Sequence, residues 1–133
     1  MWDLESRSRI RSFTEHNGPI ESLSIIDPTH TLTHTYCIIT GSHDSNIKLW
    51  DMSKSSAIST LAGHVGAVHG VSADSLRIAS AGSDQTVKIW DIETGKCLYT
   101  FSHKFGVSCV LISDTKLISS DLSGIVIVRD FLY

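Results

Sequence analysis

Short apolar segments separated by turn-forming residues run along the whole chain, and within many of them apolar and polar positions alternate with a period of two. Such alternation predicts half-buried β-strands, and β-branched residues such as Val87 and Ile89 suit a pleated, packed surface. No window shows an amphipathic helix with caps. The strands expected are Ile20–Ile26, Tyr36–Thr40, Asn46–Trp50, Ala57–Leu61, Ala67–Ser72, Arg77–Ala81, Thr86–Trp90, Cys97–Phe101, Val107–Ile112, Lys116–Ser120 and Ile125–Arg129.

These strands belong to a repeat of about forty residues, the period typical of propeller arrays. Tryptophan, or arginine in the last unit, recurs at spacings of 48, 40 and 39 residues, at Trp2, Trp50, Trp90 and Arg129. Histidine keeps the same phase, at His16, His64 and His103. The longer first spacing places eight extra residues at 27–34, where a polar loop is expected to protrude between two strands.

The middle repeat carries a recognisable signature. Gly63-His64, Ala79 to Asp84 and Val87 to Asp91 resemble the WD-repeat family, and the resemblance extends over essentially the whole chain. It implies an all-β fold of four-stranded antiparallel propeller blades in an incomplete ring. Residues 1–13 would end a preceding repeat, and 14–61, 62–101 and 102–133 would follow as repeats, the last degenerate and incomplete.

Serine or threonine, histidine, aspartate and tryptophan recur together. The two sets are His64, Ser80, Asp84 and Trp90, and His16, Thr40, Asp44 and Trp50. A hydrolase triad would not be repeated in each blade, so no catalytic residue is assigned and the chain is not expected to be an enzyme. The resemblance instead implies a hydrogen-bonded network within each blade. In the last repeat the equivalents are His103, Ser119, Ser123 and Arg129, where no such network is expected.

Other candidate chemistry is sparse. His30 and His34 lie four residues apart in a polar loop with no third ligand nearby, so no metal site is assigned, and no cofactor motif is present. Arg7, Arg9 and Arg11 are interpreted as a solvated edge strand. The 133 residues carry a formal net charge of −3, which does not favour nucleic acid as a partner, and no apolar segment is long enough to span a membrane.

The expected function is a non-catalytic scaffold that binds other proteins. The alternatives are the substrate-receptor part of a ubiquitin ligase resembling F-box proteins with WD repeats, and a nucleic-acid-associated scaffold. Three unevenly spaced cysteines favour a reducing location, cytoplasm or nucleus. One face is expected to hold the loops near His16, His43, His64, Ser83 and His103. The sequence does not identify the residues that bind a partner.

The two ends of the repeat array are complementary. Arg9 to Phe13 aligns with a fourth strand and is expected to complete the last blade. The chain is interpreted either as a fragment of a larger propeller or as a unit that associates head to tail with a second copy through its open blade edges.

Overall fold

The computed structural model describes residues 2–9, 11–27, 29 and 35–131. Eleven strands form three antiparallel sheets in which sequential strands are neighbours, and no α-helix occurs among these residues. The strands are β1 (Ile20–Ile26), β2 (Cys37–Ser42), β3 (Asn46–Asp51), β4 (Ala57–Ala62), β5 (Val68–Ala73), β6 (Arg77–Gly82), β7 (Thr86–Asp91), β8 (Cys97–Ser102), β9 (Val107–Ile112), β10 (Lys116–Asp121) and β11 (Val126–Asp130). Each lies within a residue or two of its predicted range, and the predicted all-β fold is confirmed.

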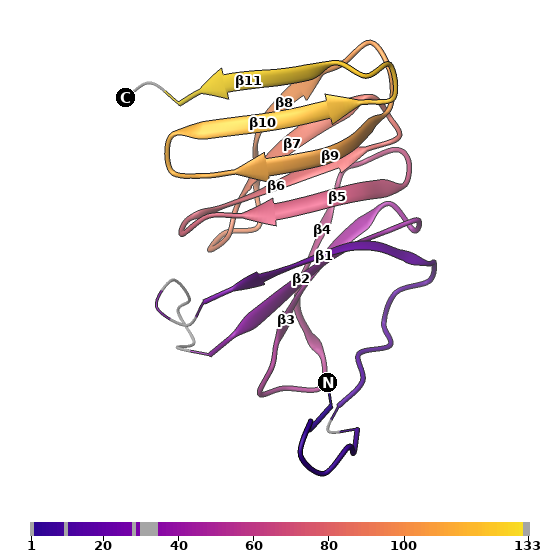
Figure 1. The fold of residues 1–133 in the computed structure, drawn as a ribbon, viewed down its shortest axis with the longest axis vertical. Helices are drawn as coiled ribbons and strands as arrows, with labels where there is room; N and C mark the ends of the chain where they lie inside the picture. The colour runs from indigo at the N-terminus through magenta and orange to yellow at the C-terminus, as the bar shows by residue number, and fades with distance from the viewer. Residues whose placement is uncertain (1, 10, 28, 30–34, 132–133) are drawn as a thin grey trace.

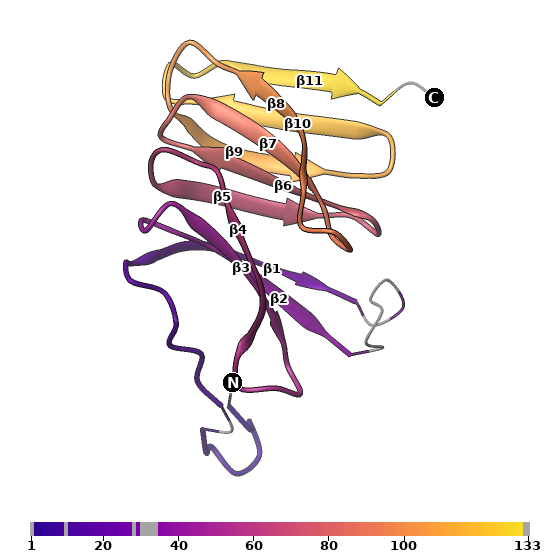
Figure 2. The same cartoon turned by 180° about the vertical axis from the view of Figure 1, so that it is seen from behind.

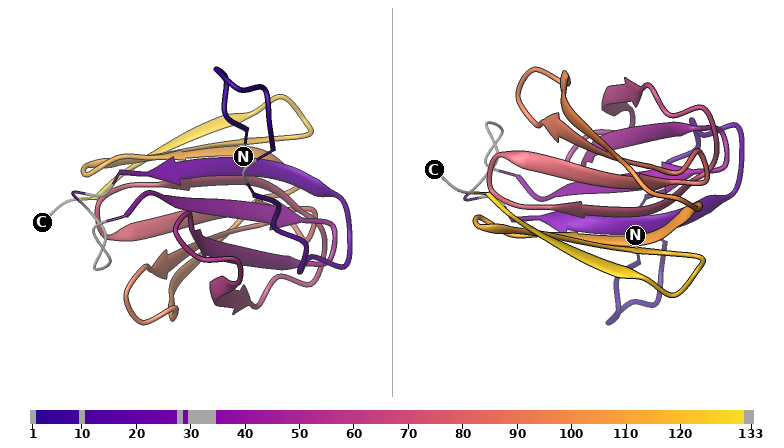
Figure 3. Two further views of the ribbon diagram at one scale, coloured as in Figure 1. Left: turned by 90° about the horizontal axis from the view of Figure 1, so that it is seen from below. Right: turned by 90° about the horizontal axis from the view of Figure 1, so that it is seen from above.

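Each sheet is a blade. Blade 1 comprises β1–β4, blade 2 comprises β5–β8 and blade 3 comprises β9–β11. The blades lie one behind another, with β5 packed between β1 and β9 (Figures 1 and 3). The ring is open, as expected for an incomplete propeller.

Two apolar layers hold the stack together. The layer between blades 1 and 2 contains Ile39, Leu49, Val71 and Trp90, and the layer between blades 2 and 3 contains Ile89 and other residues from β6, β7, β9 and β10. Strand β7 serves both layers because neighbouring side chains on a strand point to opposite faces, as Ile89 and Trp90 do. The middle blade is therefore covered on both sides.

The terminal blades each leave one face open. Leu23 and Ile25 of β1 are exposed at one end of the stack, as are Leu111, Val126 and Val128 of blade 3 at the other. Leu23 and Ile25, like Val126 and Val128, occupy alternate strand positions, whereas consecutive residues of β6 in the inner blade are buried because both faces of that blade are covered. Exposed apolar side chains gathered on one face mark a surface that another element can cover.

The N-terminal segment differs from its prediction. None of Arg9, Arg11, Ser12 and Phe13 lies in a strand, apart from an isolated bridge between Trp2 and Arg9. The segment follows blade 1, at the opposite end of the stack from β11 (Figure 2). Its contacts there are local: Arg11 Nη1 donates to the carbonyl oxygens of Met52 and Lys54, both at 2.7 Å. Within one chain this segment does not complete the last blade, because that edge is far away and blade 1 offers nearer acceptors, whereas its pairing with the last blade of a second copy stays a prediction.

Two further findings concern the cysteines and membrane-spanning helices. The cysteines all lie in strands, Cys37 buried and Cys97 and Cys109 exposed. Within the described part of the chain there is no helix with the length and apolarity needed to cross a membrane.

Candidate functional site

Blade 2 brings its four predicted site residues into one hydrogen-bonded chain. Trp90 Nε1 donates to Ser80 Oγ at 2.8 Å, Ser80 Oγ lies 2.7 Å from His64 Nε2, and His64 Nδ1 lies 2.9 Å from Asp84 Oδ2. Ser80, His64 and Trp90 are buried. This series of hydrogen bonds extends from Trp90 in β7 to Asp84 in the turn between β6 and β7.

Local structure explains how these side chains meet. Ser80 and Trp90 lie on the paired strands β6 and β7, and Asp84 lies in the turn that joins them. In that turn Gln85 has a φ of 67°, and Asp84 Oδ1 accepts a hydrogen bond from the backbone N–H of Thr86 at 3.1 Å. Aspartate is favoured at such positions because its side chain caps the turn. His64 reaches the chain from the β4–β5 connection.

The direction of each hydrogen bond follows from the groups involved. The indole N–H only donates, and a carboxylate only accepts. His64 Nδ1–H must therefore donate to Asp84, which leaves Nε2 of a neutral imidazole to accept the Ser80 hydroxyl proton. Among the described residues every buried side-chain polar atom has a partner. The serine proton points at His64 because the unprotonated Nε2 can only accept, while the serine oxygen accepts from the indole N–H.

Blade 1 repeats this arrangement with threonine in place of serine. Trp50 Nε1 donates to Thr40 Oγ1 at 2.8 Å, His16 Nε2 lies 2.7 Å from the same oxygen, and His16 Nδ1 lies 2.7 Å from Asp44 Oδ2. Ser45, in the turn after Asp44, has a φ of 68°. Two blades thus place the same chemistry at the same register positions.

Blade 3 contains a network that sequence reasoning missed. His103 Nε2 lies 2.9 Å from Ser119 Oγ, and His103 Nδ1 lies 3.2 Å from Asp121 Oδ2. Arg129 Nη1 donates to Ser119 Oγ at 3.3 Å, in the place of the indole. The prediction that no network forms here is wrong, because Asp121 at the end of β10 supplies the carboxylate that Ser123 lacks. The His103–Ser119 spacing of 16 residues, equal to that of His64 and Ser80, was the available signal.

The electrostatics of blade 2 favour a neutral histidine beside an ionised aspartate. Burial lowers the pKa of His64, and this outweighs the opposing effect of its hydrogen bond to Asp84 and of that carboxylate's charge. Burial alone would raise the pKa of Asp84, but hydrogen bonds from the Val65 N–H, Thr86 and His64 together lower it. In blade 3, hydrogen bonds led by that from Ser123 lower the pKa of Asp121 to about 2.

These shifts predict a loss of stability in mild acid. The pKa of folded His64 lies below the reference value of 6.5, so its stabilising contribution is complete above pH 6.5 and is lost as the pH falls through the folded-state pKa. We expect the free energy of unfolding, from urea titrations between pH 7.5 and 5, to fall more steeply for the wild type than for His64→Gln. Equal slopes would contradict a buried neutral imidazole.

The blade networks fix the loops along one edge of the stack, on the right in Figure 1. The N–H groups of Asn17 and Val65 each donate to the network aspartate of their own blade, Asp44 or Asp84, at 2.9 Å. Backbone hydrogen bonds also join neighbouring loops along this edge. The Ser83 N–H donates to the Ala67 oxygen, and the Leu122 N–H donates to the Gly106 oxygen. The β1–β2, β5–β6 and β9–β10 connections lie at the opposite edge.

Exposed apolar side chains project from these fixed loops. Val65, Phe105 and Leu122, called the loop rim below, are 90%, 43% and 72% exposed. The loops that carry them are neighbours, because Gly66 and Gly106 both approach Ser83, and a Cβ built on Gly106 would lie 3.4 Å from Leu122 Cδ1. Apolar groups presented by a rigid backbone are suited to binding another surface.

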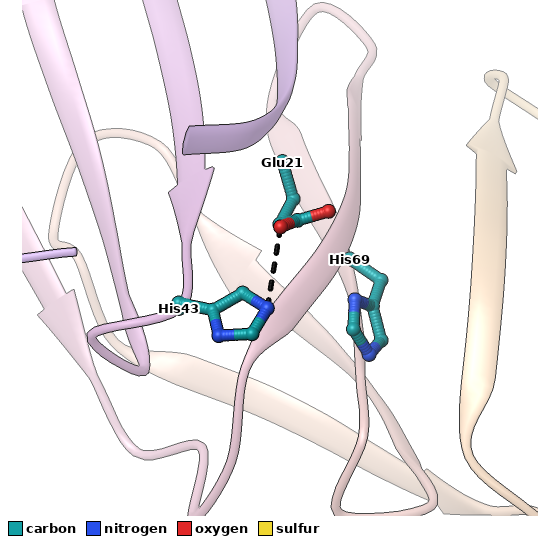
Figure 4. Close-up of side chains that lie close together, drawn as sticks. All are labelled: Glu21, His43 and His69. Carbon is teal, nitrogen blue, oxygen red and sulfur yellow. Dashed lines mark ion pairs between the residues drawn. The ribbon is translucent and has the colours of Figure 1, made fainter. Parts of the chain in front are cut away.

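A second cluster lies between blades 1 and 2, and sequence reasoning did not identify it. Glu21, His43 and His69 place one potential metal-ligating atom each within 4.8 Å of one another (Figure 4). His43 Nε2 is 3.2 Å from Glu21 Oε1. The three residues come from different elements, so no local motif in the sequence marks them.

The remaining sequence candidates gain nothing from the structure. His30 and His34, like most of the predicted 27–35 loop, lie outside the described residues. Arg7, Arg9 and Arg11 do not form an edge strand, and Arg11 instead binds the two carbonyl oxygens of blade 1.

Comparison with known proteins agrees with this geometry. The family described as "WD domain, G-beta repeat" matches residues 7–51 and 55–91, so the chain belongs to the WD-repeat family. The matched segments end at Asp51 and Asp91, each directly after the tryptophan of a blade network.

Curated relatives share the repeats at moderate identity. The chain is 28% identical over 130 residues to the Arabidopsis thaliana "U3 snoRNP-associated protein-like EMB2271", covering 94% of this chain and 26% of that protein. It is 31% identical over 122 residues to the "CCR4-associated factor 4 homolog" of Vanderwaltozyma polyspora, covering 79% of this chain and 17% of the relative. It is also 30% identical to "Mitochondrial division protein 1" of Kluyveromyces lactis, covering 79% and 16%. The chain thus spans about a quarter or less of these relatives.

Proposed function

We propose that the chain is a non-catalytic protein-interaction module whose partner protein binds the loop rim. The observation that carries this proposal is the placement of Val65, Phe105 and Leu122 on adjacent loops that the blade networks hold rigid. A preorganised apolar patch loses little conformational entropy on binding, so it can bind with useful affinity over a modest area.

The blade networks support a structural role for the serine and histidine residues. Ser80 Oγ accepts the Trp90 indole proton and is buried, and the same arrangement recurs in blade 1. A nucleophile needs access to substrate, which these hydroxyls lack. Two of the relatives are named for association with other factors, "U3 snoRNP-associated protein-like EMB2271" and "CCR4-associated factor 4 homolog", which favours a scaffold over an enzyme.

The rim proposal can be tested with two leucines of equal exposure. Leu122 lies on the rim and Leu76 lies in the β5–β6 connection at the opposite edge, and both are 72% exposed (Figure 1). We expect Leu122→Ser to weaken binding to a purified partner by about tenfold or more, as for a central interface residue, and Leu76→Ser to leave it unchanged. Partners identified by affinity capture of the tagged chain would be measured by calorimetry with both variants. Equal effects of the two variants would overturn the proposal.

A nucleic-acid-associated role is a second candidate, favoured by the snoRNP-associated relative. With a net charge of −3, we infer that such a role would act through protein contacts rather than through the phosphate backbone. The ubiquitin-ligase alternative and an intracellular location, cytoplasm or nucleus, stay predictions. Head-to-tail self-association also stays a prediction, supported by the exposed apolar faces of blades 1 and 3.

A further inference from the structure

Two of the three residues in the Glu21–His43–His69 cluster occupy β-bulges. In β1, Ile20 pairs with Ser42 and Ser22 pairs with Gly41, so Glu21 is the extra residue. In β5, Val68 pairs with Gly82 and Gly70 pairs with Ala81, so His69 is the extra residue at the equivalent position. A bulge re-aims its side chain away from the regular strand alternation.

The third residue completes the cluster from the turn after β2. Stacking of blade 2 on blade 1 brings the bulge of β5 beside that turn, and the rings of His43 and His69 lie 6.1 Å apart between centroids with an interplanar angle of 75°. Figure 4 shows the Glu21 carboxylate and both imidazoles converging from β1, the β2–β3 turn and β5. The cluster therefore bridges two blades and exists only when they are stacked.

The seam between blades 2 and 3 provides an internal comparison. At that seam Ser83 occupies the position of His43. In β9, Val107 pairs with Asp121 and Cys109 pairs with Ser120, so Ser108 is the extra residue of the bulge. The bulge of β5 again contributes His69, but serines stand in the two other positions, so the same backbone geometry recurs without a set of three metal-ligating side chains. The ligating character of the first seam comes from its side chains and not from the blade architecture.

The distances suit a tetrahedral transition-metal ion. Zinc bonds to imidazole nitrogen and carboxylate oxygen of about 2.0–2.2 Å place neighbouring ligand atoms about 3.3–3.6 Å apart. The Glu21 Oε1–His43 Nε2 distance of 3.2 Å is already close to that value. The ligating nitrogen of His69 lies within 4.8 Å of the other two ligating atoms, so a side-chain rotation would bring it into bonding distance of the same ion.

We propose that Glu21, His43 and His69 bind one divalent transition-metal ion of the Zn²⁺ class, which links blades 1 and 2. Two imidazoles and one carboxylate form a known zinc ligand set that leaves a fourth position open to water or to a side chain of a partner. Glu21 and His43 are exposed, so the ion and a fourth ligand have access from solvent. This inference does not depend on the loop-rim proposal.

The direct test is calorimetric titration of Zn²⁺ into the full chain at pH 7.5, with His30 and His34 replaced by glutamine so that they cannot contribute ligands. We expect saturable binding of one ion per chain. His43→Gln and His69→Gln should each weaken binding by at least about tenfold, while the matched exposed variant Glu93→Gln should leave it unchanged. Circular dichroism of each variant would establish that the strands are intact.

Two further readouts locate the ion and its structural effect. Zn²⁺ should shift the side-chain ring-nitrogen NMR signals of His43 and His69 but not those of His64 and His103. It should also raise the Tm of the wild type and not that of His69→Gln, because an ion that binds only the folded state stabilises it. No saturable binding, or binding unaffected by His69→Gln, would overturn the proposal.

Discussion

Replacing Trp90 with alanine is expected to lower the free energy of unfolding by about 3–5 kcal/mol, the range for deleting a large buried aromatic side chain. The indole is 2% exposed and belongs to the apolar layer between blades 1 and 2. Its ring fills the space beside Gly63, where an added Cβ would lie 3.0 Å from Trp90 Cη2. The same substitution removes the donor to Ser80. Urea unfolding followed by far-ultraviolet circular dichroism measures the loss.

Two control variants separate the contributions to this loss. Trp90→Phe keeps most of the apolar volume but removes the N–H donor, so a loss of about 1–2 kcal/mol is expected. Trp2→Ala removes a tryptophan that is 62% exposed and should change stability by less than about 0.5 kcal/mol. If Trp90→Ala were as well tolerated as Trp2→Ala, the stacked-blade arrangement would be wrong.

Substitution of His64 by alanine is expected to lower the free energy of unfolding by about 2–3 kcal/mol, because it leaves the buried Ser80 hydroxyl and one side of the Asp84 carboxylate without their partner. The loss should appear as instability of the whole stack and as weaker order in the 63–67 loop, whose Val65 N–H depends on Asp84. Urea unfolding and amide hydrogen exchange measure the two effects.

A double-mutant cycle distinguishes a connected network from independent contacts. Within blade 2, His64→Ala and Trp90→Phe act on the same serine, so their effects should be non-additive by about 0.5 kcal/mol or more. His16→Ala belongs to the separate network of blade 1 and should add to His64→Ala within about 0.5 kcal/mol. Additive effects within blade 2 would show that the three side chains do not act as one network.

The strands could be predicted from the sequence because they depend on local patterns, and the two regular blade networks could be predicted because the resemblance to the WD-repeat family implies them. In the β6–β7 hairpin Trp90 pairs with Ile78, two residues before Ser80, so Ser80 and Trp90 are diagonal neighbours on the same face of the sheet and their side chains meet when the hairpin forms. The same holds for Thr40 and Trp50 in blade 1. Alternation and turn residues were sufficient to define these hairpins.

Alignment by spacing failed where a different residue supplied the same group. In blade 3 the carboxylate comes from Asp121, 18 residues after His103, whereas Asp84 follows His64 by 20 residues. Both carboxylates nevertheless reach Nδ1 of their histidine. Asp121 lies at the end of a strand and Asp84 lies in the turn after one, yet both carboxylates reach the same place in the blade. Counting residues along the sequence does not reveal that these two positions are close in space.

The sequence by itself determined the repeat, the strand pattern and the hydrogen-bonding groups of blades 1 and 2, since these follow from contacts within one hairpin or one repeat. Only the tertiary structure decided which edge the N-terminal segment follows and which side chains meet between blades. Glu21, His43 and His69 come together because two bulged strands stack side by side. Contacts of that kind depend on how sheets pack, and sheet packing is set by the summed burial of many apolar side chains rather than by any local pattern.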